Sequence, residues 1–376
     1  MKITVAGHLC LDIIPTWQTG TLTALRPGSL VEMDGLTFST GGAVANTGIA
    51  LKRLGFEPTL IGRTGDDHVG EIIRNLLRSE HINPDYIALS PGETSSYTIV
   101  LNPPDTDRIF LHYPGTNDSF SADDVNFGAI PPGIFHFGYP PLMQQMYVGD
   151  GVQLERIFRK AKERGLVTSL DMALPDPDTE QGQVDWQGIL QRIMPLVDLF
   201  LPSFDELLFM MEPSAYEKMQ QGLLTVDTAL LDELSDRLLA WGCNVVGIKL
   251  GAEGLYLRTG IKAAEVFGES WVCRHILAPI FEVKVQGTTG AGDTTIAGFL
   301  GAMSLGKEPE QVLAFANAVG AFCVEAVSSI AGIPHRVSVE QRIETGWKRV
   351  KPSLVHGEWR LSDSGVYLGP LDRKTG

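Results

Sequence analysis

Strand-like and helix-like segments alternate along most of this chain, and that alternation restricts the fold more than any other feature. Apolar residues at helical spacing predict helices at 43–54, 68–80, 151–164, 186–194, 203–211, 227–241, 293–305 and 309–327. Short apolar runs predict buried strands at 2–7, 59–61, 133–137, 166–171, 197–201, 244–249, 254–258 and 278–285. Such alternation is typical of an α/β protein whose mostly parallel sheet is covered by helices on both faces. In these sheets, ligands bind at the carboxyl ends of the strands.

A second group of segments alternates apolar and polar residues with a period of two. Residues 30–40, 97–101 and 108–113 follow this pattern, and the last two flank the turn sequence of residues 102–107. A sheet with one solvated face gives this pattern, so we expect a small separate sheet outside the main core. The tail after about residue 352 is polar and rich in glycine, which is compatible with an ordered strap or a loose end.

Charge and cysteine usage exclude several classes of protein. The formal charge is −15 and no run of Lys or Arg is present, so nucleic acid and acidic membrane surfaces are not expected partners. The four cysteines are far apart without a CxxC pair, which argues against a zinc site or a disulfide framework. No apolar run is long enough for a membrane span, and the N-terminal segment lacks a cleavage pattern, so we expect a cytoplasmic protein.

The most informative motif is Gly-Thr-Thr-Gly-Ala-Gly-Asp at residues 287–293, which precedes an apolar helix. Glycines let the backbone approach a ligand closely, and the first amides of a helix have no internal partner. Together with the helix dipole these groups form an anion site. An ionised Asp293 beside a phosphoryl group can accept the proton of an attacking hydroxyl. The alternative is a tight turn with Asp293 as a plain helix cap. A Walker A loop is excluded because the motif has no lysine, and Thr295 replaces the third glycine of a Rossmann fingerprint.

Two further glycine-rich segments leave their roles open. In residues 41–55, two glycines open a helix, and the Asn46 amide on its first turns can bond sugar hydroxyls or simply cap the turn. Residues 62–70 end a strand and start a helix, where a structural turn and a binding role are both compatible with the sequence.

Together these segments resemble the ribokinase-like, PfkB-type family of sugar kinases. The stretch GGAVANTGIALKRLG is similar to the N-terminal signature of that family, and TTGAGDTTIAGFL is similar to its C-terminal signature. The resemblance implies a three-layer α/β/α ribokinase-like domain over residues 1–350, with a small β-sheet lid from segments of about 13–40 and 95–115. Residues 351–376 would then be a C-terminal extension.

The resemblance also implies an ATP-dependent phosphotransferase that uses Mg²⁺ and acts on a hydroxyl of a small sugar. Asp293 matches the catalytic base, and the residues that match the anion hole are Gly290, Ala291 and Gly292. The residues that match the sugar site, besides Asp293, are Asp12, Gly41, Gly42 and Asn46. The residues in segments that line the nucleotide site are Ser203, Lys249, Gly251, Thr288, Gly290, Gly292 and Asn317. Glu206 matches the acid that helps to organise magnesium.

Two departures from the family pattern affect the expected ion requirements. Gly287 stands where relatives often have an Asp that helps to hold a monovalent cation, so we do not expect potassium activation. Ser203 replaces the Asn of an Asn-x-x-Glu motif. A nucleoside kinase of the same superfamily and a regulatory protein that binds ligand without turnover remain alternatives. The resemblance also makes a homodimer formed through the lid plausible.

Overall fold

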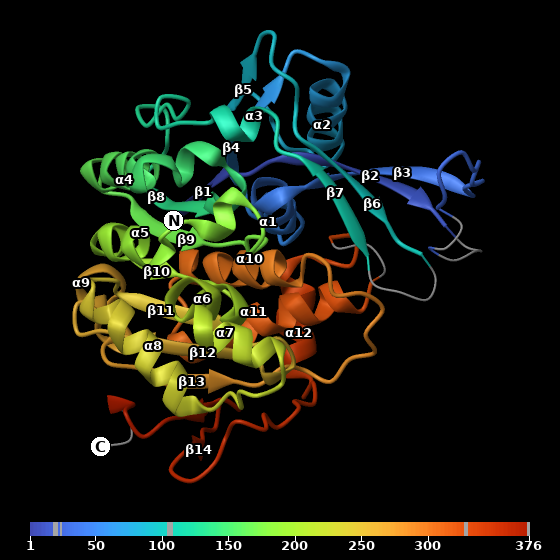
Figure 1. Cartoon of the computed structure of the whole chain (residues 1–376). Helices are drawn as coiled ribbons and strands as arrows, with labels where there is room; N and C mark the ends of the chain where they lie inside the picture. The colour runs from blue at the N-terminus through green and yellow to red at the C-terminus, as the bar shows by residue number, and fades with distance from the viewer. Residues whose placement is uncertain (18–21, 23–24, 104–107, 327–329, 374–376) are drawn as a thin grey trace.

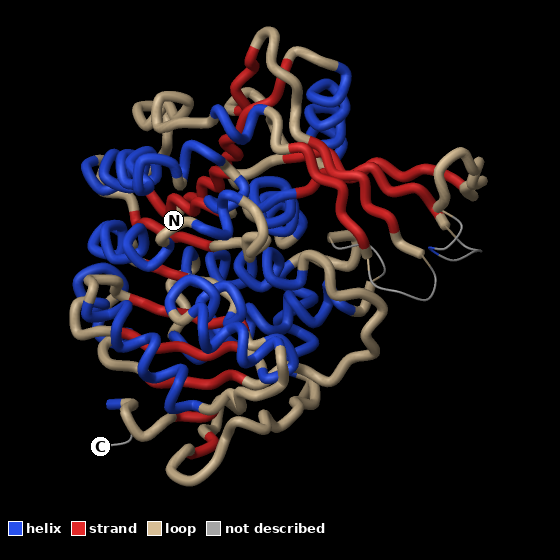
Figure 2. The backbone as a smooth tube through the Cα atoms, in the orientation of Figure 1, coloured by secondary structure: helices blue, strands red, loops and turns tan. Residues whose placement is uncertain are grey.

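The computed structural model describes residues 1–17, 22, 25–103, 108–326 and 330–373 (Figures 1 and 2). A large sheet lies between two layers of helices, and a small four-stranded sheet projects from one end of the molecule (Figure 1). This arrangement confirms the predicted three-layer α/β class with a separate small sheet. No helix in the described part of the chain is both long and apolar enough to cross a bilayer.

The central sheet has eleven strands in the order β14-β15-β13-β12-β11-β10-β9-β8-β1-β4-β5. Its strands are β1 (Lys2–Gly7), β4 (Thr59–Gly65), β5 (Ile87–Ser90), β8 (Gly133–Gly138), β9 (Val167–Asp171), β10 (Leu199–Phe200), β11 (Val245–Lys249), β12 (Leu255–Thr259), β13 (His275–Ala278), β14 (Arg360–Leu361) and β15 (Tyr367–Leu368). The pairs from β5 to β11 are parallel, and those from β11 to β14 are antiparallel. The sheet is therefore mostly parallel, as predicted, with an antiparallel edge.

Alternating residues of the buried strands fill two separate apolar cores. Leu199 and Val245 pack on one face of the sheet, whereas Phe200 and Val246 pack on the other. Strands that are apolar on both faces must be covered on both, and the helices do this. The α-helices are α1 (Gly42–Arg53), α2 (His68–Ser79), α3 (Thr116–Ser119), α4 (Val148–Glu163), α5 (Trp186–Ile193), α6 (Phe204–Met211), α7 (Pro213–Gln220), α8 (Thr228–Ala240), α9 (Ala263–Phe267), α10 (Ala291–Ser304), α11 (Pro309–Val324) and α12 (Arg336–Glu344). The first core includes residues of α1, α10 and α11, and the second includes residues of α4, α5, α6 and α8.

The small sheet has the order β3-β2-β6-β7. Its strands are β2 (Cys10–Thr16), β3 (Gly35–Gly41), β6 (Tyr97–Leu101) and β7 (Ile109–Tyr113). The predicted hairpin of 97–101 with 108–113 is confirmed by the antiparallel register of β6 and β7. The predicted strand at 30–40 is wrong in its first half, because pairing with β2 begins only at Gly35. Residues 104–107 of the predicted turn, and residues 18–21 and 23–24 of the predicted lid segment, lie outside the described residues.

The predicted strand at 278–285 is also wrong. The strand of this region is β13, and the chain leaves the sheet at Pro279, which has no N–H for a ladder bond. Phe281 is nevertheless buried, because its ring stacks on Trp347 at a centroid distance of 4.6 Å. Phe281, one of the apolar residues that suggested a strand, is therefore covered by a distant segment, whereas Val285 is exposed. The predicted helix at 309–327 ends at Val324, and residue 327 lies outside the described residues.

The C-terminal tail takes part in the central sheet. Strand β15 pairs with β13, and β14 pairs with β15 (Figure 1). Beyond β15, the fully buried Asp372 carboxylate accepts from Arg274 Nε at 2.9 Å. The described part of the tail is therefore an ordered strap along the antiparallel edge.

Candidate active site

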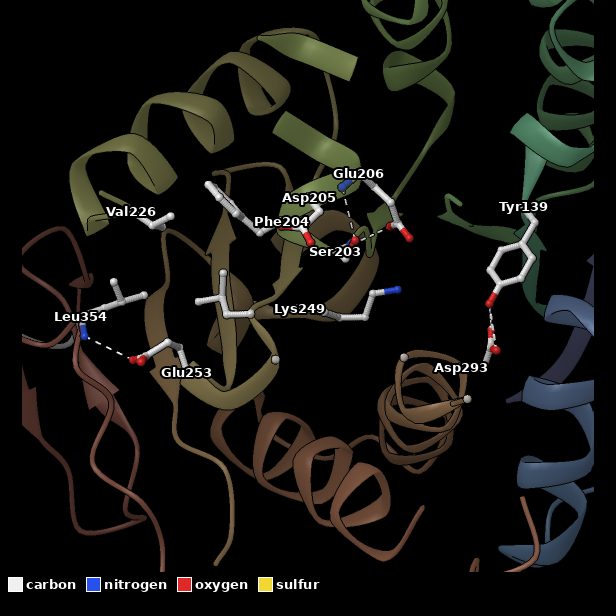
Figure 3. A pocket seen from close by; sticks show the side chains of 14 residues that line it. Tyr139, Ser203, Phe204, Asp205, Glu206, Val226, Lys249, Glu253, Asp293 and Leu354 are labelled. Carbon is white, nitrogen blue, oxygen red and sulfur yellow. Dashed lines mark hydrogen bonds between the residues drawn. The ribbon is translucent and has the colours of Figure 1, made fainter. Parts of the chain in front are cut away.

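Residues from the carboxyl ends of several parallel strands surround a cavity of about 480 Å³ (Figure 3). Tyr139 follows β8, Lys249 ends β11, and Ser203 lies just after β10. The cavity is lined by Tyr139, Ser203, Phe204, Asp205, Glu206, Val226, Lys249, Leu250, Gly251, Glu253, Gly290, Gly292, Asp293 and Leu354. Its position agrees with the general rule for ligand sites in open α/β sheets.

Asp293 lies in the first turn of α10, at the wall of this cavity. Gly290, directly before the helix, has a φ of 76°, a left-handed conformation that favours glycine. The loop leading to it is exposed, whereas Asp293 is only 3% exposed. The Ala291 amide donates to the Thr288 carbonyl at 3.2 Å, and the Thr294 amide donates to the Gly290 carbonyl at 2.9 Å. Among the described residues, the amides between them, of Gly292 and Asp293, have no backbone acceptor, as is usual in the first turn of a helix. Two amides at the start of α10 are therefore left without a backbone partner next to the Asp293 carboxylate.

Two side chains from distant parts of the chain hold the Asp293 carboxylate. The Tyr139 hydroxyl donates to Oδ1 at 2.8 Å and to Oδ2 at 2.9 Å, and Asn46 Nδ2 donates to Oδ2 at 3.0 Å. Burial raises the pKa of Asp293, while these hydrogen bonds and the charge of Lys249 act in the opposite direction. The donors therefore favour the ionised form that a general base requires.

Lys249 provides positive charge at the cavity. Its Nζ lies 2.7 Å from Oδ1 of Asp171, the last residue of β9. Nζ also lies 3.6 Å from the position that a Cβ would take on Gly292, so the ammonium group borders the anion loop. Lys249 is the only Lys or Arg among the described residues that line this cavity or the neighbouring one. Phosphates bound at the loop would therefore meet this cation.

Ser203 and Glu206 form a capping box at the start of α6. The Ser203 amide donates to Glu206 Oε2 at 2.6 Å, and Ser203 Oγ accepts from the Glu206 amide at 3.3 Å. Burial raises the pKa of Glu206, and the charge of Lys249 opposes that rise. Both residues line the cavity, so the Glu206 carboxylate faces the same space as Lys249.

A second cavity of about 380 Å³ adjoins the first and is mainly apolar. The two share Lys249, Gly251 and Gly292. The second cavity is lined by Lys249, Gly251, Ala252, Gly254, Leu255, Ile280, Phe281, Val283, Val285, Thr288, Ala291, Gly292, Thr295, Asn317, Gly320, Ala321 and Val324. The Asn317 amide nitrogen donates to the carbonyl oxygens of Ala278 and Pro279 at 2.8 and 3.1 Å. Asn317 therefore fixes the wall of this cavity.

The residues predicted for the sugar belong to strands of the small sheet and to the start of α1. Asp12, on β2, accepts a weak hydrogen bond from Cys10 Sγ at 3.6 Å, and burial raises the pKa of Asp12 to about 6. Asn46 connects these residues to Asp293 directly. The ring of His8 lies 5.3 Å from that of His112 on β7 and 6.2 Å from that of Tyr139. The small sheet therefore lies close to His8 and, through it, to Tyr139, which holds the Asp293 carboxylate.

The structure brings the predicted site residues together in three adjoining groups. The residues at the first cavity are Ser203, Glu206, Lys249, Gly251, Gly290, Gly292 and Asp293. Those of the second cavity include Thr288, Ala291 and Asn317. The group predicted to bind the sugar consists of Asp12, Gly41, Gly42 and Asn46, and Asn46 joins it to Asp293. The segment 62–70 joins the end of β4 to the start of α2, where Asp67 caps α2 and accepts from Ser95 Oγ at 2.6 Å.

Sequence reasoning missed Tyr139, Asp171 and His8. Each lies at the carboxyl end of a parallel strand, or directly after it. A place at the carboxyl end of a predicted parallel strand could have identified these residues, because ligands in such sheets bind at that edge.

Comparisons with known proteins agree with this geometry. The model of the family described as "pfkB family carbohydrate kinase" matches residues 2–336. The Arabidopsis thaliana protein named probable fructokinase-5 is 27% identical over 340 residues, which cover 87% of this chain and 93% of that protein. The ribokinase of A. thaliana, solved with ribose and ATP, is 22% identical with a TM-score of 0.67, covering 90% of this chain and 97% of that one. A candidate ribokinase II from E. coli, solved with ATP and Mg²⁺, is 20% identical with a TM-score of 0.66, covering 92% of this chain and 99% of that one.

Proposed function

Since the chain belongs to the pfkB family of carbohydrate kinases, we propose that it transfers the γ-phosphate of ATP to a hydroxyl of a small sugar, with Asp293 as the general base. One observation carries this proposal. The buried Asp293 carboxylate stands between the sugar-side residue Asn46 and the glycine loop at the start of α10. A base in this position can reach an acceptor hydroxyl and a phosphoryl group at the same time.

In the proposed complex, ATP lies across the two cavities. The adenine ring lies in the apolar cavity, and the phosphates extend past Gly292 and Lys249 towards Asp293. Solved relatives with ATP support this use of the fold. Mg²⁺ is usually held by one or two carboxylates together with phosphates and water, and Glu206 offers a carboxylate at the cavity wall, so the residues present fit that ion. Bound magnesium would neutralise phosphate charge.

The reaction at the chain's own residues follows from this arrangement. Asp12 accepts a hydrogen bond from one sugar hydroxyl and so orients the substrate. Asp293 takes the proton of the attacking hydroxyl, whose oxygen forms a bond to the γ-phosphorus while the bond to the β–γ bridging oxygen breaks. ADP leaves, and the amides of the anion loop together with Lys249 stabilise the charge on the transferring group.

Replacing Asp293 by Asn tests the proposal. The variant keeps the size and hydrogen-bonding reach of the side chain but is a very poor proton acceptor, so kcat should fall by ~100- to 10,000-fold. The measurement is ADP release with Mg²⁺ and a panel of sugars and nucleosides, together with nucleotide binding, which should persist.

Asp185→Asn is the matched control, because Asp185 caps α5 through the Gly188 amide and lies outside both cavities. Near-normal turnover by Asp293→Asn would show that Asp293 is not the general base and that its role is structural, like that of the helix cap Asp185. Failure of every acceptor with the wild-type protein would reject the kinase proposal itself.

A further inference from the structure

Tyr139 has an unusual backbone conformation at the carboxyl end of β8. Its φ is 67° and its ψ is 44°, in the left-handed region that non-glycine residues rarely adopt. Two hydrogen bonds keep it there: the Tyr139 amide donates to the Asp171 carbonyl at 3.3 Å, and its carbonyl accepts from Leu142 at 3.0 Å. Strained residues of this kind persist only where surrounding contacts fix them, and they are frequent at active sites.

This conformation places the Tyr139 side chain in the cavity wall beside Asp293, with its hydroxyl pointing at the carboxylate (Figure 3). Its hydroxyl lies nearly equidistant from the two carboxylate oxygens, at 2.8 and 2.9 Å, across 154 residues of sequence. Among the hydrogen bonds between described residues, those from Tyr139 reach both oxygens, whereas the bond from Asn46 reaches Oδ2 alone. The Tyr139 hydroxyl therefore contacts both carboxylate oxygens, and together with the Asn46 bond to Oδ2 it restrains the orientation of the carboxylate.

We propose that Tyr139 is the positioning residue of the catalytic base, which orients the Asp293 carboxylate and keeps it ionised while the sugar hydroxyl is deprotonated. The proposal rests on the kinase function proposed above. A buried carboxylate without donors takes up a proton, and a protonated Asp293 cannot act as a base. Burial also raises the pKa of Tyr139 well above its ordinary value, so the phenol stays protonated and remains a donor.

An alternative role for the Tyr139 hydroxyl predicts the opposite effect of its removal on turnover. The Tyr139 hydroxyl could occupy the position of the acceptor hydroxyl until sugar displaces it. Its removal would then free the base, so that kcat/KM for sugar would rise. A positioning role instead predicts that removal lowers turnover and moves its pH dependence.

The test is the pH profile of kcat for Tyr139→Phe, measured at saturating sugar and ATP. Under these conditions kcat reports ionisations in the bound complex. The variant loses the hydrogen bond from the Tyr139 hydroxyl to the charged Asp293 carboxylate. The acid limb of the kcat profile should therefore move to higher pH by about one unit, which is a tenfold change in the ratio of ionised to protonated Asp293. On the plateau above that limb, kcat should fall by roughly 10-fold because the base is less well oriented.

Tyr147→Phe is the matched control. Tyr147 is a buried tyrosine of the same segment, its ring packs edge-on against Trp186, and it lines neither cavity. Its removal should leave the pH profile of kcat unchanged. Thermal unfolding of both variants would show whether either loses its fold.

A second variant keeps the hydroxyl and so avoids a loss of packing. Incorporation of 3-fluorotyrosine at position 139 makes the phenol a stronger donor, which should move the acid limb to lower pH. Opposite shifts in the two variants would support the positioning role. An unchanged acid limb of the kcat profile in Tyr139→Phe, or a higher kcat/KM for sugar, would overturn the positioning role. Activity of the wild-type protein would still support the kinase function in that case.

Discussion

At the level of single residues, two glycines at the start of α1 are required by what lies against them. A Cβ on Gly41 would lie 2.5 Å from Asp12 Oδ1, and a Cβ on Gly42 would lie 2.5 Å from His8 Nδ1. Gly42 also has a φ of 85°, which is strained for any other residue. The two glycines therefore let the helix start approach the sugar-side residues, and this approach shields the carboxylate of Asp12 from water.

The shielding of Asp12 gives a pH prediction for sugar binding. Burial raises the pKa of Asp12 from 3.8 to about 6, so the carboxylate gains a proton as the pH falls through that value. Only the ionised form offers all of its oxygen lone pairs to a sugar hydroxyl. We expect the KM for sugar to rise by roughly tenfold between pH 7 and pH 5.

The measurement is the KM of the wild-type enzyme across this range at constant ionic strength, compared with Asp12→Asn. The variant should bind sugar more weakly at pH 7 but show little change with pH. A wild-type KM that stays constant from pH 5 to pH 7 would contradict the proposed role of Asp12.

At the level of elements, the C-terminal strap depends on a buried ion pair. Arg274 is fully buried, and Asp372 accepts both from its Nε and from the His275 amide at 2.9 Å. Arg274 also contacts Glu310 of α11 at 2.7 Å. The pair therefore links the end of the tail to β13 and, through Arg274, to a core helix.

Removing one partner of this pair should be costly, because the other charge stays buried. Since Arg274 keeps Glu310 as a partner, we expect Asp372→Ala to lower the free energy of unfolding by about 1.5–3 kcal/mol, the range for losing a hydrogen bond to a charged group. The control is Asp363→Ala, which changes an exposed aspartate in the turn between β14 and β15. Equal stabilities of the two variants in urea unfolding would show that the strap contributes little.

At the level of the whole molecule, the small sheet and the α/β body meet on the sugar side of Asp293. Thr98 of β6 and His112 of β7 are hydrogen-bonded at 2.9 Å, and His112 faces His8, which follows β1. A small sheet is stable only when one face packs on something. We propose that this sheet is a lid that covers the sugar and excludes water, so that phosphate goes to the sugar hydroxyl.

Hydrogen exchange would test the lid. Amides of β6 and β7 should gain protection when sugar binds, whereas those around the apolar cavity, in α11, should respond mainly to nucleotide. Residues of β14 at the far edge of the central sheet provide an internal control. Unchanged exchange in β6 and β7 at saturating sugar would reject the lid.

Local sequence information was sufficient to locate most of the elements and the glycine loop before α10. Periodicity depends only on neighbours along the chain, so it located most strands and helices and the small sheet. Periodicity failed at residues 279–285. There the apolar side chain of Phe281 packs against Trp347 of a distant segment and not within the sheet.

The completed site was decided by tertiary structure. Asp293 meets Asn46 across 247 residues and Tyr139 across 154, while Lys249 meets Asp171 across 78. These pairs form because the strand order places the ends of β1, β8, β9 and β11 on one edge of the sheet, beside the start of α10. The strand order depends on burying both apolar faces of the central sheet under helices at the same time. This burial involves the whole chain, so no local sequence pattern encodes it.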